Sequence, residues 1–89
     1  KSQNLSIIEE MMPPNTSEKL HFHEKAEQFF YILSGKATFI LDKKVIEAQT
    51  NEGIHIKPNI RHQIQNVTNE DLRFLVISQP TSRGDRIEI

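Results

Sequence analysis

The sequence of 89 residues contains no cysteine, so no disulfide framework stabilises the protein. This absence leaves the redox state of its compartment open. It also removes thiolate from the available metal ligands, so any bound metal ion must be held by nitrogen and oxygen atoms. Disulfide-rich scaffolds and cysteine-based metal sites are therefore both excluded.

Neither an excess of positive charge nor a long apolar run is present. Eleven Lys and Arg residues against twelve Asp and Glu residues give a formal net charge of −1, without the basic cluster that binds phosphate backbones. The longest apolar run, residues 29–33, is far shorter than the roughly 20 residues of a membrane-spanning helix. No signal-peptide pattern opens the sequence. We expect no nucleic-acid partner, no membrane partner and a cytoplasmic location.

The short chain limits the size of the hydrophobic core. A length of 89 residues predicts a single domain over residues 1–89. A domain of this size buries only roughly 60–65% of the surface that its unfolded chain exposes. A metal ion, a partner subunit or both would therefore help to stabilise it.

Turn-forming residues recur about every eight to twelve positions, and short runs rich in Ile, Val, Phe and Thr lie between them. No window keeps a helical periodicity without a Gly or Pro interrupting it. This pattern predicts an all-β sandwich or barrel of antiparallel strands with almost no helix. The predicted strands are residues 5–12, 19–23, 28–33, 36–41, 45–48, 54–56, 62–67, 72–78 and 86–89.

Two of these strands are apolar on both faces. In residues 28–33 and 72–77 the side chains on either face are largely hydrophobic, apart from Arg73 in the second strand. Such strands must be covered on both sides. One face can line the interior of a barrel, and we expect a second subunit to cover the other, which makes the protein a homodimer. The alternative is that residues 5–12 fold across this face.

Three histidines have a spacing that suits a metal site. Side chains at positions i and i+2 of a strand point to the same face, so His21 and His23 can share one ion. A third histidine, His62, opens a later strand after the turn at residues 58–61. Neutral imidazole suits zinc, copper, iron and nickel. The sequence therefore predicts a metal site of converging histidines inside a small β-barrel.

The fourth metal ligand is expected from the strand that follows the histidine pair. Gln28 shares a face of this strand with Phe30 and Ile32, which we place in the interior. Glu27 points the opposite way in a regular strand, and a bulge at residues 26–27 would reverse the choice. We favour Gln28.

Two motifs in these segments resemble those of the cupin family. Residues 15–35 resemble its first motif, G-x5-H-x-H-x3–4-E-x6-G, with His21, His23 and Gly35 in place and Gln28 at the glutamate position. Residues 51–66 resemble its second motif, G-x5-P-x-G-x2-H-x3-N, with His62 at its histidine. The resemblance covers nearly the whole chain. It implies a small single-domain cupin with a jelly-roll β-barrel and one divalent transition metal ion, which the sequence does not resolve among Zn, Fe, Ni, Mn and Cu.

The departures from these motifs are of two kinds. Motif glycines are replaced by Asn15, Asn51 and Asn59, and asparagine is the other residue that readily adopts a positive φ, so the turns can persist. Gln28 stands where the family commonly has a metal-binding glutamate. An amide oxygen can coordinate a metal but brings no negative charge, so affinity should fall and Lewis acidity should rise. The alternative is a cupin whose metal site has decayed.

The remaining polar residues are assigned to the surface or to turns. His55 alternates with Ile54 and Ile56 and should face outward. Asn66, which matches the last position of the second motif, is expected to cap a turn. The surface assignments are Tyr31, the carboxylates Glu9, Glu10, Glu24 and Glu27, and the tail residues Arg83, Asp85 and Arg86 near the barrel mouth. Arg73 either lies on the surface or, if its strand turns it inward, binds an anionic substrate.

The resemblance leaves three classes of function open, because one fold hosts many activities. The favoured class is non-redox Lewis-acid chemistry, such as isomerisation or ring opening, on a small oxygenated molecule such as a sugar or a keto or enol acid. The set of three histidines and a glutamine is similar to that of small pectin-degradation cupins, which promote ring opening of unsaturated uronic sugars. The alternatives are a metal-dependent dioxygenase and a non-catalytic ligand-binding or sensor module. No catalytic acid or base is assigned.

Overall fold

The computed structural model describes residues 5–80 and 85–88, and in this part of the chain every regular element is a β-strand. None of these residues forms a helix long and apolar enough to cross a membrane. The strands are β1 (Ser6–Met12), β2 (Thr16–Ser17), β3 (His21–His23), β4 (Glu27–Ser34), β5 (Lys36–Leu41), β6 (Lys44–Gln49), β7 (Gly53–Ile56), β8 (His62–Asn66), β9 (Leu72–Gln79) and β10 (Arg86–Glu88).

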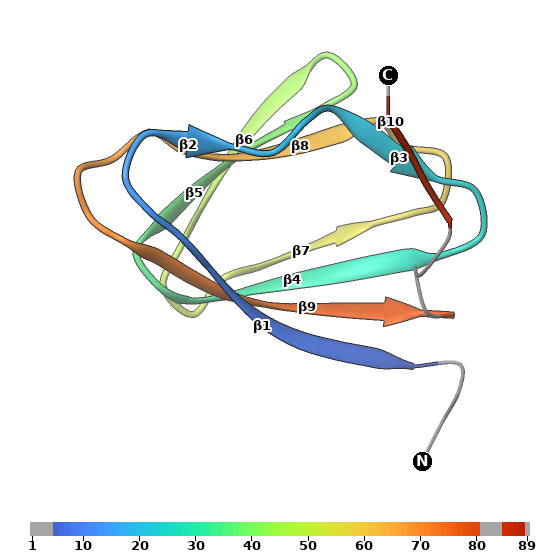
Figure 1. The fold of residues 1–89 in the computed structure, drawn as a ribbon, viewed down its shortest axis with the longest axis horizontal. Helices are drawn as coiled ribbons and strands as arrows, with labels where there is room; N and C mark the ends of the chain where they lie inside the picture. The colour runs from blue at the N-terminus through green and yellow to red at the C-terminus, as the bar shows by residue number, and fades with distance from the viewer. Residues whose placement is uncertain (1–4, 81–84, 89) are drawn as a thin grey trace.

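The strands form two sheets that face each other (Figure 1). One sheet has the order β1-β9-β4-β7, and the other has the order β10-β3-β8-β5-β6, with the short β2 also pairing with β8. Neighbouring strands are antiparallel, and most neighbours are distant in the sequence. The predicted small jelly-roll β-barrel is thereby confirmed.

The predicted strand boundaries agree with the structure within one residue, with one exception. Residues 19–23 were expected to form one strand, but only His21–His23 do, and the two-residue β2 that precedes them was not predicted. β2 carries no apolar alternation, because it consists of Thr16 and Ser17, which are both exposed. Residue 89, the last residue of the predicted strand 86–89, lies outside the described residues.

The hydrophobic core fills one end of the space between the sheets. Phe30, Phe39 and Phe74 are each at most 3% exposed. The ring centroids of Phe30 and Phe39 lie 5.2 Å apart, and those of Phe30 and Phe74 lie 5.8 Å apart. Aromatic pairs at this distance add to the stability gained by burial. Five of the seven buried polar side chains gather at the other end, where β4 and β8 begin and β9 ends: His21, His23, Gln28, His62 and Ser78.

The turns use asparagine at the positions where the sequence predicted it. Asn15, Asn51 and Asn59 have φ values of 58°, 71° and 70°, in the left-handed region. The interpretation that asparagine replaces glycine there is confirmed. Gly35 has a φ of 95°, and a Cβ on it would lie 2.8 Å from the carbonyl oxygen of Asp71. Only glycine fits that position without strain.

The outer face of the β1-β9-β4-β7 sheet keeps an apolar row. Ile7 pairs with Ile77, which pairs with Phe29, and alternation turns all three away from the interior. Ile7 is 61% exposed and Phe29 is 38% exposed. β1 extends the edge of this sheet beside β9 and does not lie across its face (Figure 1). The alternative in which residues 5–12 cover the face is therefore wrong.

Dimerisation through this face stays a prediction. We expect light scattering at micromolar concentration to give twice the mass of one chain, because a second copy would bury the apolar row. Ile7→Lys should shift the mass toward one chain by placing a charge in that interface. Val45→Lys, which changes an equally exposed residue of the other sheet, should not. A single-chain mass for the unaltered protein would contradict the prediction.

Candidate metal centre

Two adjacent strands carry the three histidines. His21 of β3 is paired directly with His62 at the start of β8, and His23 lies two residues further along β3. Because strand side chains alternate, these three point inward while the intervening Phe22 does not. All three are buried, with exposures of 3%, 5% and 1% for His21, His23 and His62.

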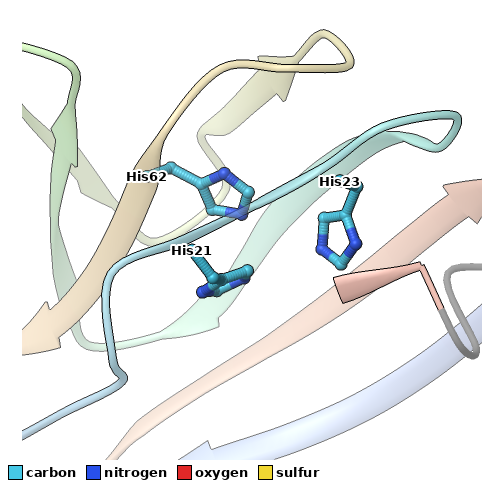
Figure 2. Close-up of side chains that lie close together, drawn as sticks. All are labelled: His21, His23 and His62. Carbon is cyan, nitrogen blue, oxygen red and sulfur yellow. The ribbon is translucent and has the colours of Figure 1, made fainter. Parts of the chain in front are cut away.

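The three imidazole rings face one another, as Figure 2 shows. Ring centroids lie 5.2 Å apart for His21 and His23 and 4.3 Å apart for His21 and His62. The separation between His23 and His62 is 5.7 Å. One nitrogen from each ring lies within 4.8 Å of the other two. The structure thus brings together the three histidines whose spacing predicted a metal site.

Backbone carbonyls fix the tautomers of two of these rings. Nδ1 of His21 lies 2.7 Å from the carbonyl oxygen of Lys19, and Nδ1 of His62 lies 2.9 Å from that of Ile60. A carbonyl oxygen only accepts hydrogen bonds, so each Nδ1 carries the hydrogen and donates it. Nε2 of both rings therefore keeps its lone pair. A hydrogen bond from the ring nitrogen that does not bind the metal typically orients a metal-binding histidine.

Burial keeps the histidines neutral at physiological pH. Desolvation lowers the pKa of His62 to about 4, because the charged form loses its hydration. Desolvation also lowers the pKa values of His21 and His23, although the hydrogen bond to Lys19 opposes the effect at His21. Neutral imidazole is the form that binds a metal ion.

Buried nitrogen and oxygen atoms without partners show that a cation fits this site. Among the described residues, four buried side-chain atoms have no hydrogen-bond partner: Nε2 of His62, Nδ1 of His23, Oε1 of Gln28 and Oγ1 of Thr38. Buried polar atoms are nearly always paired, and the first three belong to the histidine cluster and to Gln28 beside it. Nε2 of His62 and Oε1 of Gln28 each offer a lone pair, and so does Nδ1 of His23 in the tautomer with its hydrogen on Nε2, which suits a metal cation.

Gln28 lies in the same hollow as His21 and His23. Its side chain is only 6% exposed, and its Nε2 donates a hydrogen bond of 3.0 Å to Oγ of Ser78 on the adjacent β9. This bond leaves Oε1 as the free atom of the amide. An amide held in this way leaves its oxygen, and not its nitrogen, available to a ligand in the hollow.

The alternative ligand, Glu27, points away from the site. β4 begins in regular register, with Glu27 opposite Gln79 and Gln28 opposite Ser78, and its only register shift lies between Ile32 and Ser34. No bulge therefore reverses the two side chains. Glu27 is exposed, and its Oε1 lies 3.3 Å from Nε2 of His55, which faces outward as predicted.

The hollow is lined by three charged residues that sequence analysis did not assign to a site: Glu10, Glu18 and Arg86. It has a volume of about 130 Å³, and Glu18 and Arg86 line it beside the histidines. Burial raises the pKa of Glu18 above its usual range, although the positive charge of Arg86 opposes the change. Glu18 was not considered because β2 and its connection to β3 show no periodicity, and Arg86 was assigned to a surface turn.

Glu10 also lines this hollow, although it was assigned to the solvated surface. Its side chain is exposed, but it lies at the rim. The alternation of β1 could have predicted this position, because Glu10 shares a face of the strand with Met12, which is buried.

The other predicted residues lie outside the hollow. Arg73 is on the outer face, 3.7 Å from a carboxylate oxygen of Glu9, and Tyr31 donates a 2.9 Å hydrogen bond to Asn51 on the same side. The Asp85 carboxylate accepts hydrogen bonds from backbone N–H groups of residues 24–26 and so holds the β3–β4 turn. Arg83 lies outside the described residues.

Asn66 caps a turn after its strand, as predicted. Its side chain is fully buried, and its Nδ2 donates to the carbonyl oxygens of Met12 and Glu70 at 3.0 and 2.7 Å. Its Oδ1 accepts a hydrogen bond of 3.0 Å from the backbone N–H of Thr68. Asn66 therefore closes the β8–β9 connection at the end opposite the histidines.

Comparison with known proteins places this architecture in a family. The model of the cupin domain matches residues 8–78. The chain is 32% identical to the uncharacterized protein MJ1618 of Methanocaldococcus jannaschii over 89 residues, which are all of this chain and 71% of that protein. It is 32% identical over 66 residues to an oxalate-binding protein of Thermotoga maritima, covering 74% of this chain and 54% of the relative.

A solved structure has the same fold. The crystal structure of a proposed sugar phosphate isomerase from Acidithiobacillus ferrooxidans superimposes with a TM-score of 0.80 at 25% identity. The match covers 89% of this chain and 52% of that one. The chain therefore spans only about half of the length of two of these three proteins.

The depressed histidine pKa values predict a loss of stability in mild acid. The unfolded chain binds a proton at His62 near pH 6.5, whereas the folded, metal-free protein binds it only near pH 4. Protonation between these values therefore favours unfolding, and stability is fully present above about pH 6.5. We expect the free energy of unfolding to fall by about 2 kcal/mol between pH 7.5 and 5 from this residue alone.

Urea unfolding of chelator-treated protein at these two pH values measures this change. His62→Gln should reduce the pH dependence. Equal unfolding free energies of the unaltered protein at pH 7.5 and pH 5 would contradict the expectation.

Proposed function

This chain belongs to the cupin family, which confirms the predicted resemblance, and from that premise we propose that its three buried histidines and Gln28 hold one divalent transition metal ion. The observation that carries the proposal is the set of buried nitrogen and oxygen atoms without hydrogen-bond partners on His23, His62 and Gln28. We further propose that the site acts on a small oxygenated molecule by isomerisation or ring opening, without redox change.

A bound divalent ion would supply a Lewis acid that polarises carbonyl and hydroxyl oxygens. The protein ligands proposed for it are all neutral, because the histidines are uncharged and Gln28 replaces a carboxylate. A neutral ligand set leaves the ion its full positive charge and favours the lower oxidation state. This supports non-redox chemistry over the dioxygenase alternative.

The hollow suits a small anionic or polar ligand. Its volume of about 130 Å³ admits only a few heavy atoms at a time. Arg86 lines it, and a guanidinium group suits a carboxylate or phosphate of the ligand. The names of two relatives fit this class, since one binds oxalate and another is a proposed sugar phosphate isomerase. Each ligand carries oxygens on neighbouring carbons.

Glu18 is the group that we propose to move protons. Isomerisation and ring opening both require a proton to leave one carbon or oxygen and reach another. A carboxyl group whose pKa is raised by burial exchanges protons closer to neutral pH than a solvated one. Glu18 lies in the hollow that His21 and His23 also line, so it has access to the same ligand.

A non-catalytic module is the second candidate. The name of the Thermotoga maritima relative refers to oxalate binding and not to a reaction, which favours simple ligand capture. The two candidates differ in whether Glu18 affects turnover.

Metal content and affinity test the ligand set. Protein purified without added metal should contain close to one equivalent of a transition metal by elemental analysis. Zinc titration of the chelated protein should show about tenfold or greater tightening in Gln28→Glu, because a carboxylate adds a negative charge to the neutral site. Gln65→Glu, on the outward side of β8, should change affinity little. Less than about a tenth of an equivalent of metal, together with no zinc binding, would exclude the site.

Proton exchange tests the reaction class. We expect the metal-loaded protein to exchange protons adjacent to the carbonyl of at least one member of a panel of ketoses and 2-keto acids in D2O, followed by NMR. Glu18→Gln should slow this exchange about 10²-fold or more while zinc affinity stays unchanged. Glu24→Gln, an exposed change of the same kind, serves as the control. Exchange as fast in Glu18→Gln as in the unaltered protein would assign the proton transfer elsewhere.

A further inference from the structure

A second and larger hollow lies at the open seam between the two sheets. β6 and β7 are edge strands of their sheets and do not pair with each other. The β5–β6 turn and the connection from β7 to β8 lie at the same end of the barrel (Figure 1). Between them is a hollow of about 740 Å³, which lies within the usual range of small-molecule sites.

The floor of this hollow is apolar. Leu41 of β5, Ile56 of β7 and Ile60 of the following connection line it. Ile56 is buried in the core, and Leu41 and Ile60 pack against that core. These side chains present hydrocarbon surface that an apolar ligand could cover.

The rim of the hollow is strongly cationic. Lys43, Lys44, Lys57 and Arg61 line it, and Asp42 is the one carboxylate among its lining residues. The chain as a whole has a formal net charge of −1. This local excess of positive charge is therefore not a property of the general surface.

The rim cations also differ from other cations in their pairing. In residues 5–80 and 85–88, Lys19, Lys36, Arg73 and Arg86 each lie 3.5–3.8 Å from a carboxylate oxygen. The four rim cations form no such ion pair within the same residues. Lys25 is the one other cation there without an ion pair. Four neighbouring unpaired positive charges repel one another, and a bound anion would relieve that repulsion.

We propose that this hollow, here named the seam pocket, binds a small amphipathic anion. Its apolar body would cover Leu41, Ile56 and Ile60, and its carboxylate, sulfonate or phosphate group would lie among the rim cations. The apolar floor separates this ligand class from the small polar molecules proposed for the metal centre. The proposal does not rest on the metal or on any reaction there.

The probe for the test is 8-anilinonaphthalene-1-sulfonate, which combines an aromatic body with one anionic group. Fluorescence titration should show saturable binding of one equivalent that weakens as salt is added. Amide NMR signals of residues 41–44 and 56–61 should shift during the titration, because these segments form the pocket. N-phenyl-1-naphthylamine, which lacks the sulfonate, should bind at least about tenfold more weakly, since the electrostatic part of binding is lost.

Two double variants distinguish binding in the seam pocket from a general effect of charge on binding. Lys43→Gln with Lys57→Gln removes two rim charges and should weaken binding about tenfold or more. Lys19→Gln with Lys25→Gln removes two charges elsewhere and should change binding less than about twofold. Circular dichroism checks that both double variants fold. Equal weakening in the two double variants, or NMR shifts centred on the outer face of the β1-β9-β4-β7 sheet, would overturn the proposal, as would binding that does not saturate.

Discussion

The pairing of β3 with the start of β8 is the constraint on which the rest of the site depends. It sets His21 directly opposite His62, and the two-residue repeat of a strand then adds His23 on the same side. The carbonyl oxygens of Lys19 and Ile60 belong to the residues just before these strands, and they orient two of the rings. The same backbone segments that form the sheet therefore also select the tautomer that leaves Nε2 free.

This arrangement has a cost in the metal-free protein. Neutral histidines and an amide in the interior leave buried lone pairs without partners, and a domain of 89 residues has little core to offset them. Most of the buried polar side chains lie at the histidine end of the interior, and the three phenylalanines and Ile32 lie toward the other. A bound ion would stabilise the folded state, because the unfolded chain does not hold these ligands together.

Local pattern was enough to predict most of the fold and which way the candidate metal residues point, and distant contacts were needed for the rest. Strand alternation placed His21, His23 and Gln28 inward and His55 and Glu27 outward, because these residues lie in regular strands. Asn15, Asn51 and Asn59 identified turns through their own backbone preference. Glu18 and Arg86 were not predicted, since they reach the hollow through the packing of β2 and β10 beside β3 and β8, which no local period specifies. The seam pocket likewise depends on two turns that are distant in the sequence.

The most direct test of the account is the anomalous difference density of a crystal grown with the metal that the protein carries from its host. The account predicts one strong peak between the rings of His21, His23 and His62, with the Oε1 atom of Gln28 directed at it. A protein that carries metal but shows no peak between these rings, or shows its peak at another cluster of side chains, would contradict the account.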